Sequence, residues 1–146
     1  MQAIILSAGR GKRLSKWITY PKCLIKLNSN QTLIERIIDL LNKEGISDIH
    51  LVLGYKSNLI KKKIKTKINY HYFKKFNTCN NLQTLLSVKK LLNKETIILF
   101  SDIIFDKKIL RCVKNKNRNI VLAIKTNRIL KDTMRVKVKN TKITDI

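Results

Sequence analysis

The sequence predicts an α/β fold of three layers, in which helices cover both faces of a mainly parallel sheet. Three short runs of nearly continuous hydrophobicity, at Gln2–Ser7, Asp48–Leu53 and Thr96–Phe100, are typical of strands buried on both faces. Stretches with helical spacing of apolar residues lie between them, and strands that alternate with helices form βαβ units. The length of 146 residues and the apolar fraction of 44% suit one domain with one core.

The first strand and the first helix have clear boundaries. Gln2–Ser7 runs into a loop rich in Gly and Arg, and Thr32-Leu-Ile-Glu35 has the form of a capping box. In that motif the Thr hydroxyl and the Glu carboxylate satisfy free amides at the start of a helix. Gly45 stands where the C-cap of this helix belongs. The apolar residues at helical spacing are Leu33, Ile34, Ile37, Ile38 and Leu41.

The same pattern repeats in the middle of the chain. The strand Asp48–Leu53 ends at Gly54, and Asn69–Phe73 is predicted to be another strand. Between them the sequence predicts a basic helix at Asn58–Lys67, with Ser57 as its cap.

The last third adds two helices and up to four strands. Leucines at positions 82, 85, 86 and 92 predict a helix over residues 81–93, and Asp106 can cap a short helix that ends near Lys114. Ser101-Asp102 stops the strand Thr96–Phe100. The remaining predicted strands are Asn119–Thr126 and a hairpin of Met134–Val138 with Ile143–Ile146.

The net charge of +23 invites a nucleic-acid or membrane interpretation. However, Lys, Ile and Asn make up 61 of the 146 residues, as expected for a genome rich in A and T, and the charge divides into +10 in residues 1–73 and +13 in residues 74–146. A dedicated basic arm would be lopsided. We therefore favour compositional drift and expect no specific nucleic-acid partner. The alternative is a shallow basic patch formed by Lys61, Lys62, Lys63, Lys65 and Lys67.

The longest apolar runs are four residues long, too short for a membrane span or a signal peptide, so we expect no membrane association. Cys23, Cys79 and Cys112 are widely spaced and form no CxxC pair, which argues against a disulfide framework and a structural zinc site and favours a reducing cytoplasm. His50 and His71 are interpreted as ordinary strand or surface residues.

The loop Ser7-Ala-Gly-Arg-Gly-Lys-Arg13 has the composition of a phosphate cradle. Two glycines let the backbone turn tightly and approach a ligand, and free amides in such a turn attract anions. Arg10, Lys12 and Arg13 add positive charge. The loop lacks the third Gly of GxGxxG and the GK[ST] of a Walker A loop. The alternative is a tight βα turn with solvated cations.

Asp102 follows a predicted central strand, at the sheet edge where ligands of open α/β folds gather. Its carboxylate could hold Mg²⁺ together with phosphate oxygens. Taken alone, Asp102 is better explained as a turn or cap residue. Together with a phosphate loop on the same edge, it favours metal binding.

The segments AIILSAGRGKRL, Pro21-Lys22-Cys23-Leu24 and LVLGY resemble, in this order, the nucleotidyltransferase superfamily that activates sugar phosphates and related phosphate esters. The resemblance implies a Rossmann-like nucleotidyltransferase fold. Asn80-Asn81-Leu-Gln-Thr84-Leu85, Leu99-Phe-Ser-Asp102-Ile-Ile and the hairpin from Met134 to Ile146 are similar to the phosphocholine cytidylyltransferase-like branch.

The resemblance implies transfer of an NMP, most simply CMP from CTP, to a phosphorylated small molecule such as phosphocholine, a phosphonate or a sugar phosphate, with release of pyrophosphate. It implies catalytic roles for Arg13 and Lys22 and a Mg²⁺ ion on Asp102. The nucleotide-binding residues it implies are Leu6, Ala8, Gly9, Arg10, Gly11, Lys12, Arg13, Asn81 and Thr84.

Members of this superfamily are normally longer and supply a second metal-binding Asp from near their C-terminus. Here the sequence stops at Ile146, and Asp145 stands in a different context. The resemblance thus implies a nucleotidyltransferase domain over residues 1–146 that lacks its C-terminal part, as a fragment, as a shortened form or as a chain that depends on another. The alternatives are a non-catalytic nucleotide- or partner-binding remnant of the same fold and a basic nucleic-acid binder. The sequence leaves open whether the chain forms a homo-oligomer.

Overall fold

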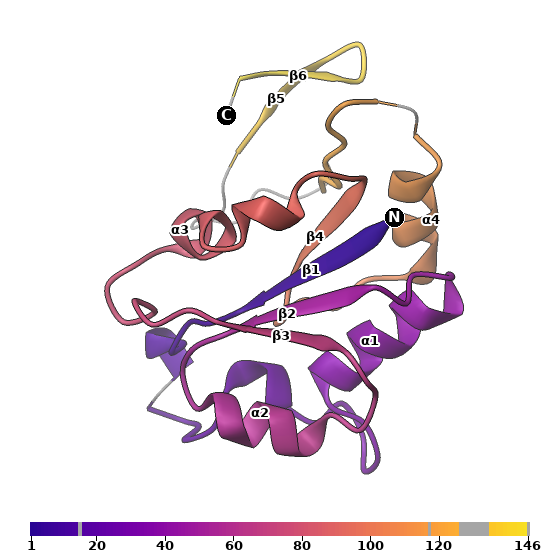
Figure 1. Cartoon of the computed structure of the whole chain (residues 1–146). Coiled ribbons are helices and arrows are strands. Elements are labelled where there is room, and N and C mark those ends of the chain that lie inside the picture. The colour runs from indigo at the N-terminus through magenta and orange to yellow at the C-terminus, as the bar shows by residue number, and fades with distance from the viewer. Residues whose placement is uncertain (15, 117, 126–134, 146) are drawn as a thin grey trace.

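The computed structural model describes residues 1–14, 16–116, 118–125 and 135–145. Four parallel strands form the central sheet in the order β3-β2-β1-β4 (Figure 1). The sheet strands and the helices alternate along the chain: β1 (Gln2–Ser7), α1 (Leu33–Lys43), β2 (Ile49–Leu53), α2 (Ser57–Lys63), β3 (Asn69–Tyr72), α3 (Asn81–Leu86), β4 (Thr96–Phe100) and α4 (Lys107–Lys114). Short 3₁₀ helices lie at η1 (Lys12–Leu14), η2 (Lys22–Leu24) and η3 (Lys89–Leu91).

Two apolar clusters confirm the three layers. On one face of the sheet α1, α2 and α4 pack against Ile5, Leu51 and Ile97, and on the other α3 and η3 pack against Ile4 and Val52. Figure 1 shows α3 on one side of the strands and α1 with α2 on the other. The predicted α/β fold with a mainly parallel sheet is therefore confirmed.

The start of α1 forms as predicted. Thr32 Oγ1 accepts from the amide of Glu35, and a Glu35 carboxylate oxygen accepts from the amide and hydroxyl of Thr32. Burial alone would raise the pKa of Glu35, but these hydrogen bonds and the nearby Lys63 hold it below its ordinary value. At the other end Gly45 takes the positive φ of 76° that favours glycine.

Two helices are shorter than predicted. The predicted basic helix 58–67 is α2, Ser57–Lys63, because Ile64 turns to extended backbone and packs into the core. Ser57 lies inside this helix, and the N-cap position is held by Lys56 in a left-handed conformation. All five lysines of the patch considered above are exposed, and Lys63 pairs with Glu35 at 3.8 Å.

The predicted helix 81–93 is divided into α3 and η3. The hydroxyl of Ser87 donates to the carbonyl of Thr84 at 2.6 Å, a local bond that competes with a continuous helix. Leu85, Val88 and Leu91 then contact the sheet at a spacing of three residues, which suits a 3₁₀ turn. Leu82, Leu86 and Leu92, on which the prediction relied, are exposed.

Three further expectations for the C-terminal third need correction. β4 is not a strand buried on both faces: it is an edge of the described sheet, and Ile98 and Phe100 are each 44% exposed. Residues 119–125 of the predicted strand 119–126 are irregular, with Ile120 exposed, and Thr126 lies outside the described residues.

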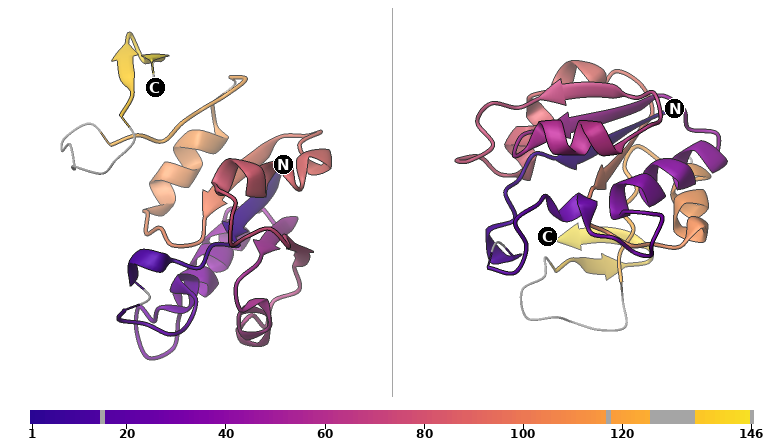
Figure 2. Two further views of the ribbon diagram at one scale, coloured as in Figure 1. Left: turned by 90° about the vertical axis from the view of Figure 1, so that its left-hand side faces the viewer. Right: turned by 90° about the horizontal axis from the view of Figure 1, so that it is seen from below.

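The predicted hairpin is present with shifted bounds. β5 (Lys137–Lys139) and β6 (Lys142–Asp145) form a separate antiparallel sheet, seen in Figure 2. Asn140 and Thr141 both have positive φ, which fits a two-residue hairpin turn. Met134 and Ile146, which were predicted to belong to the hairpin, lie outside the described residues.

Candidate functional site

The sheet order places a topological switch point at β1. The chain moves from β1 to β2 and β3 on one side, whereas β4 returns to the other side of β1. Ligands of open α/β sheets bind beyond the carboxyl ends of the strands at such a point. The loops after β1 and β4 are therefore the first places to look for chemistry.

The loop after β1 is anchored at its start and exposed at its tip. Ala8 is buried, and its carbonyl accepts from the amide of Tyr55 at 3.0 Å. Gly9 and Arg10 are exposed. Gly11 then takes a φ of 66°, and its carbonyl accepts from the amide of Leu14 as η1 begins. This backbone presents the loop tip to solvent above a fixed base.

Lys22 packs directly on this loop. A Cβ atom added to Gly11 would lie 2.6 Å from Lys22 Cε, so the aliphatic stem of Lys22 occupies the space that a side chain would need. The ammonium Nζ lies 3.5 Å from Asp102 Oδ2. The predicted loop, the Pro-Lys segment and the acidic residue thus meet at one corner, although they lie far apart in the sequence.

Asp102 reaches this corner because β4 is joined to β1. The amide of Ser101 donates to the carbonyl of Leu6 at 3.2 Å, which continues the strand pairing one residue beyond β4. Ser101 is buried, whereas the side chain of Asp102 is 42% exposed. Its carboxylate is held beside Lys22 and is still open to a ligand.

The thiol of Cys23 lies beneath the corner and has no nucleophilic role there. It is buried and interacts with the side chain of Ser7. Burial raises the pKa of the Cys23 thiol to about 11, so the thiolate needed for nucleophilic attack does not form near neutral pH.

Residues 73–80 form the opposite wall of the site. The amide of Phe73 donates to the carbonyl of Leu53 at 2.8 Å, and the ring of Phe76 lies over Gly54. A Cβ at Gly54 would come within 2.6 Å of both Ala8 O and Phe76 Cβ, so only glycine lets the two walls approach this closely.

A cavity of about 420 Å³ lies between the two walls. It is lined by residues from the first loop and from the second wall with the start of α3, namely Gly9, Arg10, Lys12, Phe76, Asn77, Thr78, Cys79, Asn80 and Gln83. The ring of Tyr55 contacts the lining residue Arg10 and also Lys56, with Arg10 Cζ 5.3 Å and Lys56 Nζ 5.4 Å from the ring centre. Polar amides therefore face a cationic loop across the cavity.

The nucleotide-binding residues implied by the resemblance take different positions. Gly9, Arg10 and Lys12 line the cavity. Leu6 and Ala8 are buried at the base of the loop. Arg13 is exposed in η1, and neither it nor Gly11 is among the lining residues.

Around α3 the structure selects different side chains from those implied. Asn81 is exposed, and Thr84 is buried with its hydroxyl donating to the carbonyl of Asn80 at 2.9 Å. Asn80 and Gln83 line the cavity instead, and they form a capping box with two bonds of 3.0 Å. The spacing Asn-x-x-Gln is the sequence signal that could have identified this pair.

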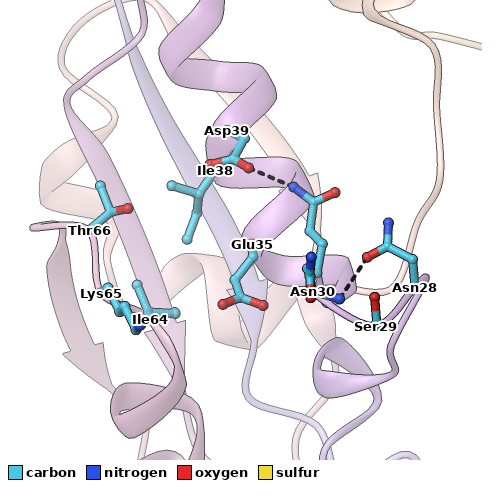
Figure 3. A pocket seen from close by; sticks show the side chains of 10 residues that line it. Asn28, Ser29, Asn30, Glu35, Ile38, Asp39, Ile64, Lys65 and Thr66 are labelled. Carbon is cyan, nitrogen blue, oxygen red and sulfur yellow. Dashed lines mark hydrogen bonds between the residues drawn. The ribbon is translucent and has the colours of Figure 1, made fainter.

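A second cavity of about 460 Å³ lies between α1 and the segment that follows α2 (Figure 3). Hydrogen bonds join some of its polar groups: the side-chain amide of Gln31 donates to a carboxylate oxygen of Asp39 at 2.6 Å, and Asn28 Oδ1 accepts from the backbone amide of Asn30 at 3.0 Å. Gly11, Lys22 and Asp102 line neither cavity, but this second cavity also lacks the residues of the loop after β1 that line the first. These bonds hold the loop that leads from Lys22 into α1, and we assign the cavity no ligand.

His50 and His71 are strand residues of β2 and β3, as predicted, and their rings also contact each other. His50 Nδ1 lies 2.9 Å from His71 Nε2, and His50 Nε2 lies 3.0 Å from a carboxylate oxygen of Asp48. In the described part of the chain, no group of three or more His, Cys, Asp or Glu residues could hold a metal ion. No helix within that part is long and apolar enough to cross a membrane.

Comparison with known proteins gives a consistent result. The sequence profile of the MobA-like NTP transferase domain family matches residues 3–122. The chain is 27% identical over 133 residues to a CTP:phosphoglutamine cytidylyltransferase of Campylobacter jejuni, an alignment that covers 85% of this chain and 52% of the relative. It is 36% identical over 100 residues to a choline-phosphate cytidylyltransferase of Streptococcus pneumoniae, which covers 67% and 43% respectively.

A solved structure of a CTP:phosphocholine cytidylyltransferase from Streptococcus pneumoniae superposes with a TM-score of 0.60 at 33% identity. The match covers 69% of this chain and 44% of that one. The chain therefore spans about half the length of the curated relatives and of the solved structure it matches.

Proposed function

The chain belongs to the family of MobA-like NTP transferase domains, and on that premise we propose that it transfers CMP from CTP to a small phosphorylated acceptor and releases pyrophosphate. The observation that carries the proposal is the corner formed by Gly11, Lys22 and Asp102, whose loop also lines a cavity of about 420 Å³ through Gly9, Arg10 and Lys12. The choice of CTP and of a phosphorylated acceptor is supported by the names of the two cytidylyltransferases to which the chain is similar.

In this proposal the nucleotide lies between the loop after β1 and residues 73–83. Asn80 and Gln83 offer amide groups that can hydrogen-bond a base or ribose. Arg10 and Lys12 line the cavity on the side on which the triphosphate would lie, and Lys22 packs on Gly11 of the same loop. The anionic phosphates thus meet the cations, and the polar base meets neutral amides.

The residues at the corner fit a magnesium ion that arrives with the nucleotide. Mg²⁺ is usually bound through one or two carboxylates together with water and substrate phosphates. Asp102 supplies one partly exposed carboxylate at the correct edge of the sheet. A bound Mg²⁺ would neutralise charge on the phosphate oxygens as the α–β bond breaks.

The chain's own contribution to the reaction is positioning and charge. An oxygen of the acceptor attacks the α-phosphorus of CTP, and the bond to the β-phosphate breaks to release pyrophosphate. Lys22 and Arg13 would stabilise the charge on the leaving pyrophosphate. Lys22 is ready for this role because its stem is packed on Gly11 and its ammonium group is near Asp102.

A second candidate function is nucleotide binding without transfer, which needs only the cavity and the cations that line it. In this case the chain binds a nucleotide and does not complete the transfer by itself. Both candidates predict nucleotide binding at the same corner, and they differ in turnover.

Pyrophosphate release separates the two candidates. The full chain is assayed with CTP, UTP, GTP and ATP, with Mg²⁺, against phosphocholine, an aminoalkyl phosphonate and sugar phosphates. We expect release with CTP, dependent on Mg²⁺ and on one acceptor, and its loss in Asp102→Asn. Binding of CTP without release supports the second candidate, and absence of any nucleotide binding contradicts both.

A further inference from the structure

The segment that carries Asp102 is held at two points. At its start, the buried Ser101 donates its amide to Leu6, as described above. At its end, the carbonyl of Phe105 accepts a hydrogen bond of 2.9 Å from Nη2 of Arg36 on α1. Only Asp102, Ile103 and Ile104 lie between the two fixed points. The position of the carboxylate therefore depends on both.

The guanidinium of Arg36 occupies this position at a cost. Its Nη1 atom is buried and finds no hydrogen-bond partner among the residues that the structure describes. A buried donor left without a partner is unfavourable, and a well-packed apolar side chain would avoid the loss. The hydrogen bond from Nη2 to Phe105 is thus the polar contact that gives Arg36 a role in the structure.

Apolar packing supports the segment but does not determine the path of its backbone. Ile103 and Phe105 pack against the main core cluster, whereas Ile104 is 66% exposed. Asp106 then begins α4, since its carboxylate accepts from the amide of Lys108 at 2.7 Å. Packing is not directional, so at this end of the segment the hydrogen bond from Arg36 fixes where the backbone lies.

The helix α1 connects both halves of the corner. The amide of Leu33 donates to the carbonyl of Ile25 at 3.0 Å, just after the segment that bears Lys22. One turn further, Arg36 reaches the segment that bears Asp102. The capping box fixes the start of this helix. A single rigid element thus sets both charged groups.

We infer that Arg36 is a positioning residue that holds the Asp102 segment in the place where its carboxylate can share a magnesium ion with the nucleotide. This inference rests on the proposed function, which supplies the magnesium ion. The way in which Arg36 acts is argued from its hydrogen bond to Phe105. Within the described residues Arg36 forms no hydrogen bond or ion pair with Lys22 or Asp102, and it would act through the backbone of residues 102–105.

The test uses the full chain and three variants. Arg36→Met keeps much of the side-chain volume and removes the donor, whereas Arg36→Lys keeps a donor and the charge. Arg111→Met is the matched control, because Arg111 on α4 pairs with Glu44 at the far end of α1 and carries the same charge. Titration calorimetry measures CTP affinity with and without Mg²⁺, and backbone ¹⁵N relaxation measures the order of residues 102–105.

We expect Arg36→Met to bind CTP as tightly as the wild type does when Mg²⁺ is absent. The factor by which Mg²⁺ increases the affinity for CTP should be at least about fivefold smaller in this variant than in the wild type. The order parameters of residues 102–105 fall below those of the wild type in this variant. Arg36→Lys recovers part of both quantities, and Arg111→Met changes neither.

Order parameters that stay at the wild-type value in Arg36→Met overturn the inference, whatever the metal does. The inference is also overturned if Mg²⁺ increases the CTP affinity of Arg36→Met as much as it increases that of the wild type. A wild type that binds CTP with no Mg²⁺ response contradicts the metal role in the proposed function instead, and the relaxation data then decide alone whether Arg36 holds the segment. If Arg36→Met does not fold, the comparison of Arg36→Lys with the wild type still decides.

Discussion

Lys22 Nζ and Asp102 Oδ2 lie 3.5 Å apart, and this contact joins the loop after β1 to the loop after β4 at the switch point of the sheet. The two side chains are 24% and 42% exposed, and exposed ion pairs contribute only about 0–1 kcal/mol to stability. The ion pair therefore matters for where its two side chains lie more than for the stability of the fold. It keeps one cation and one carboxylate at the edge where a phosphate and its metal would arrive.

Replacement of Gly11 by Ala tests whether the loop conformation supports this pair. We expect Gly11→Ala to lower the free energy of unfolding by about 1–2 kcal/mol, because its φ of 66° is unfavourable for Ala. The new methyl group would also displace Lys22, whose Cε lies 2.6 Å from that position. Urea denaturation measures the first effect, and CTP titration measures the second.

Gly9 provides the control in the same loop. A Cβ at Gly9 would meet nothing within 4 Å, and its φ is not positive, so Gly9→Ala should change the unfolding free energy by less than about 0.5 kcal/mol. Equal destabilisation by the two variants would show that the loop has no special conformation at Gly11.

Replacement of Gly54 by Ala tests the contact between the walls of the cavity. The added methyl group would lie 2.6 Å from Ala8 O and from Phe76 Cβ, so residues 73–80 must move away. We expect a loss of about 1–3 kcal/mol in unfolding free energy and weaker CTP binding.

A double-mutant cycle with Phe76→Ala identifies the cause. Phe76→Ala keeps Cβ but removes the ring carbon Cγ, which would lie 2.7 Å from the added methyl group, so the double variant should be less destabilised than the sum of the two single variants. Strict additivity would mean that Phe76 does not lie over Gly54.

The contact between His50 and His71 leads to a prediction of how the free energy of unfolding depends on pH. Burial and, to a smaller extent, the charge of His50 hold the pKa of His71 below its ordinary value of 6.5. Between the two pKa values the unfolded chain binds the proton and the folded chain does not. As far as His71 contributes, the free energy of unfolding is therefore highest above pH 6.5 and declines as the pH falls. Urea denaturation at pH 7.5, 6.0 and 5.0 should show a smaller decline in His71→Asn than in the wild type. Parallel curves would contradict this assignment.

Much of the fold could be predicted from local patterns. The limits of β1 and β4, the capping box of α1 and the turn at Gly45 depend on neighbouring residues in the sequence, and the structure places them as predicted. The loop and Asp102 are predicted from their places after strands, whereas Lys22 is predicted from the resemblance of its Pro-Lys segment to the nucleotidyltransferase superfamily. Their meeting at one corner follows from parallel strands with a shared carboxyl edge.

The remaining features depend on tertiary contacts that carry no periodic signal. The break between α3 and η3 arises from the hydroxyl of Ser87 and from which leucines reach the sheet. The opposite wall of the cavity lies in an irregular segment that Gly54 and Phe76 bring close to Ala8. The histidine pair requires the register that places His50 beside Asn69 of β3.

The central claim is that the Gly11–Lys22–Asp102 corner binds the phosphates of a nucleoside triphosphate. The most direct test compares the dissociation constant of CTP with Mg²⁺ for the wild type, Lys22→Met and Lys62→Met. Lys62 is exposed on α2 and loses the same charge. We predict at least about a tenfold weaker affinity for Lys22→Met, equivalent to about 1.4 kcal/mol, and little change for Lys62→Met. Equal affinities in the two variants would contradict the account, because CTP would then respond only to the overall charge of the chain.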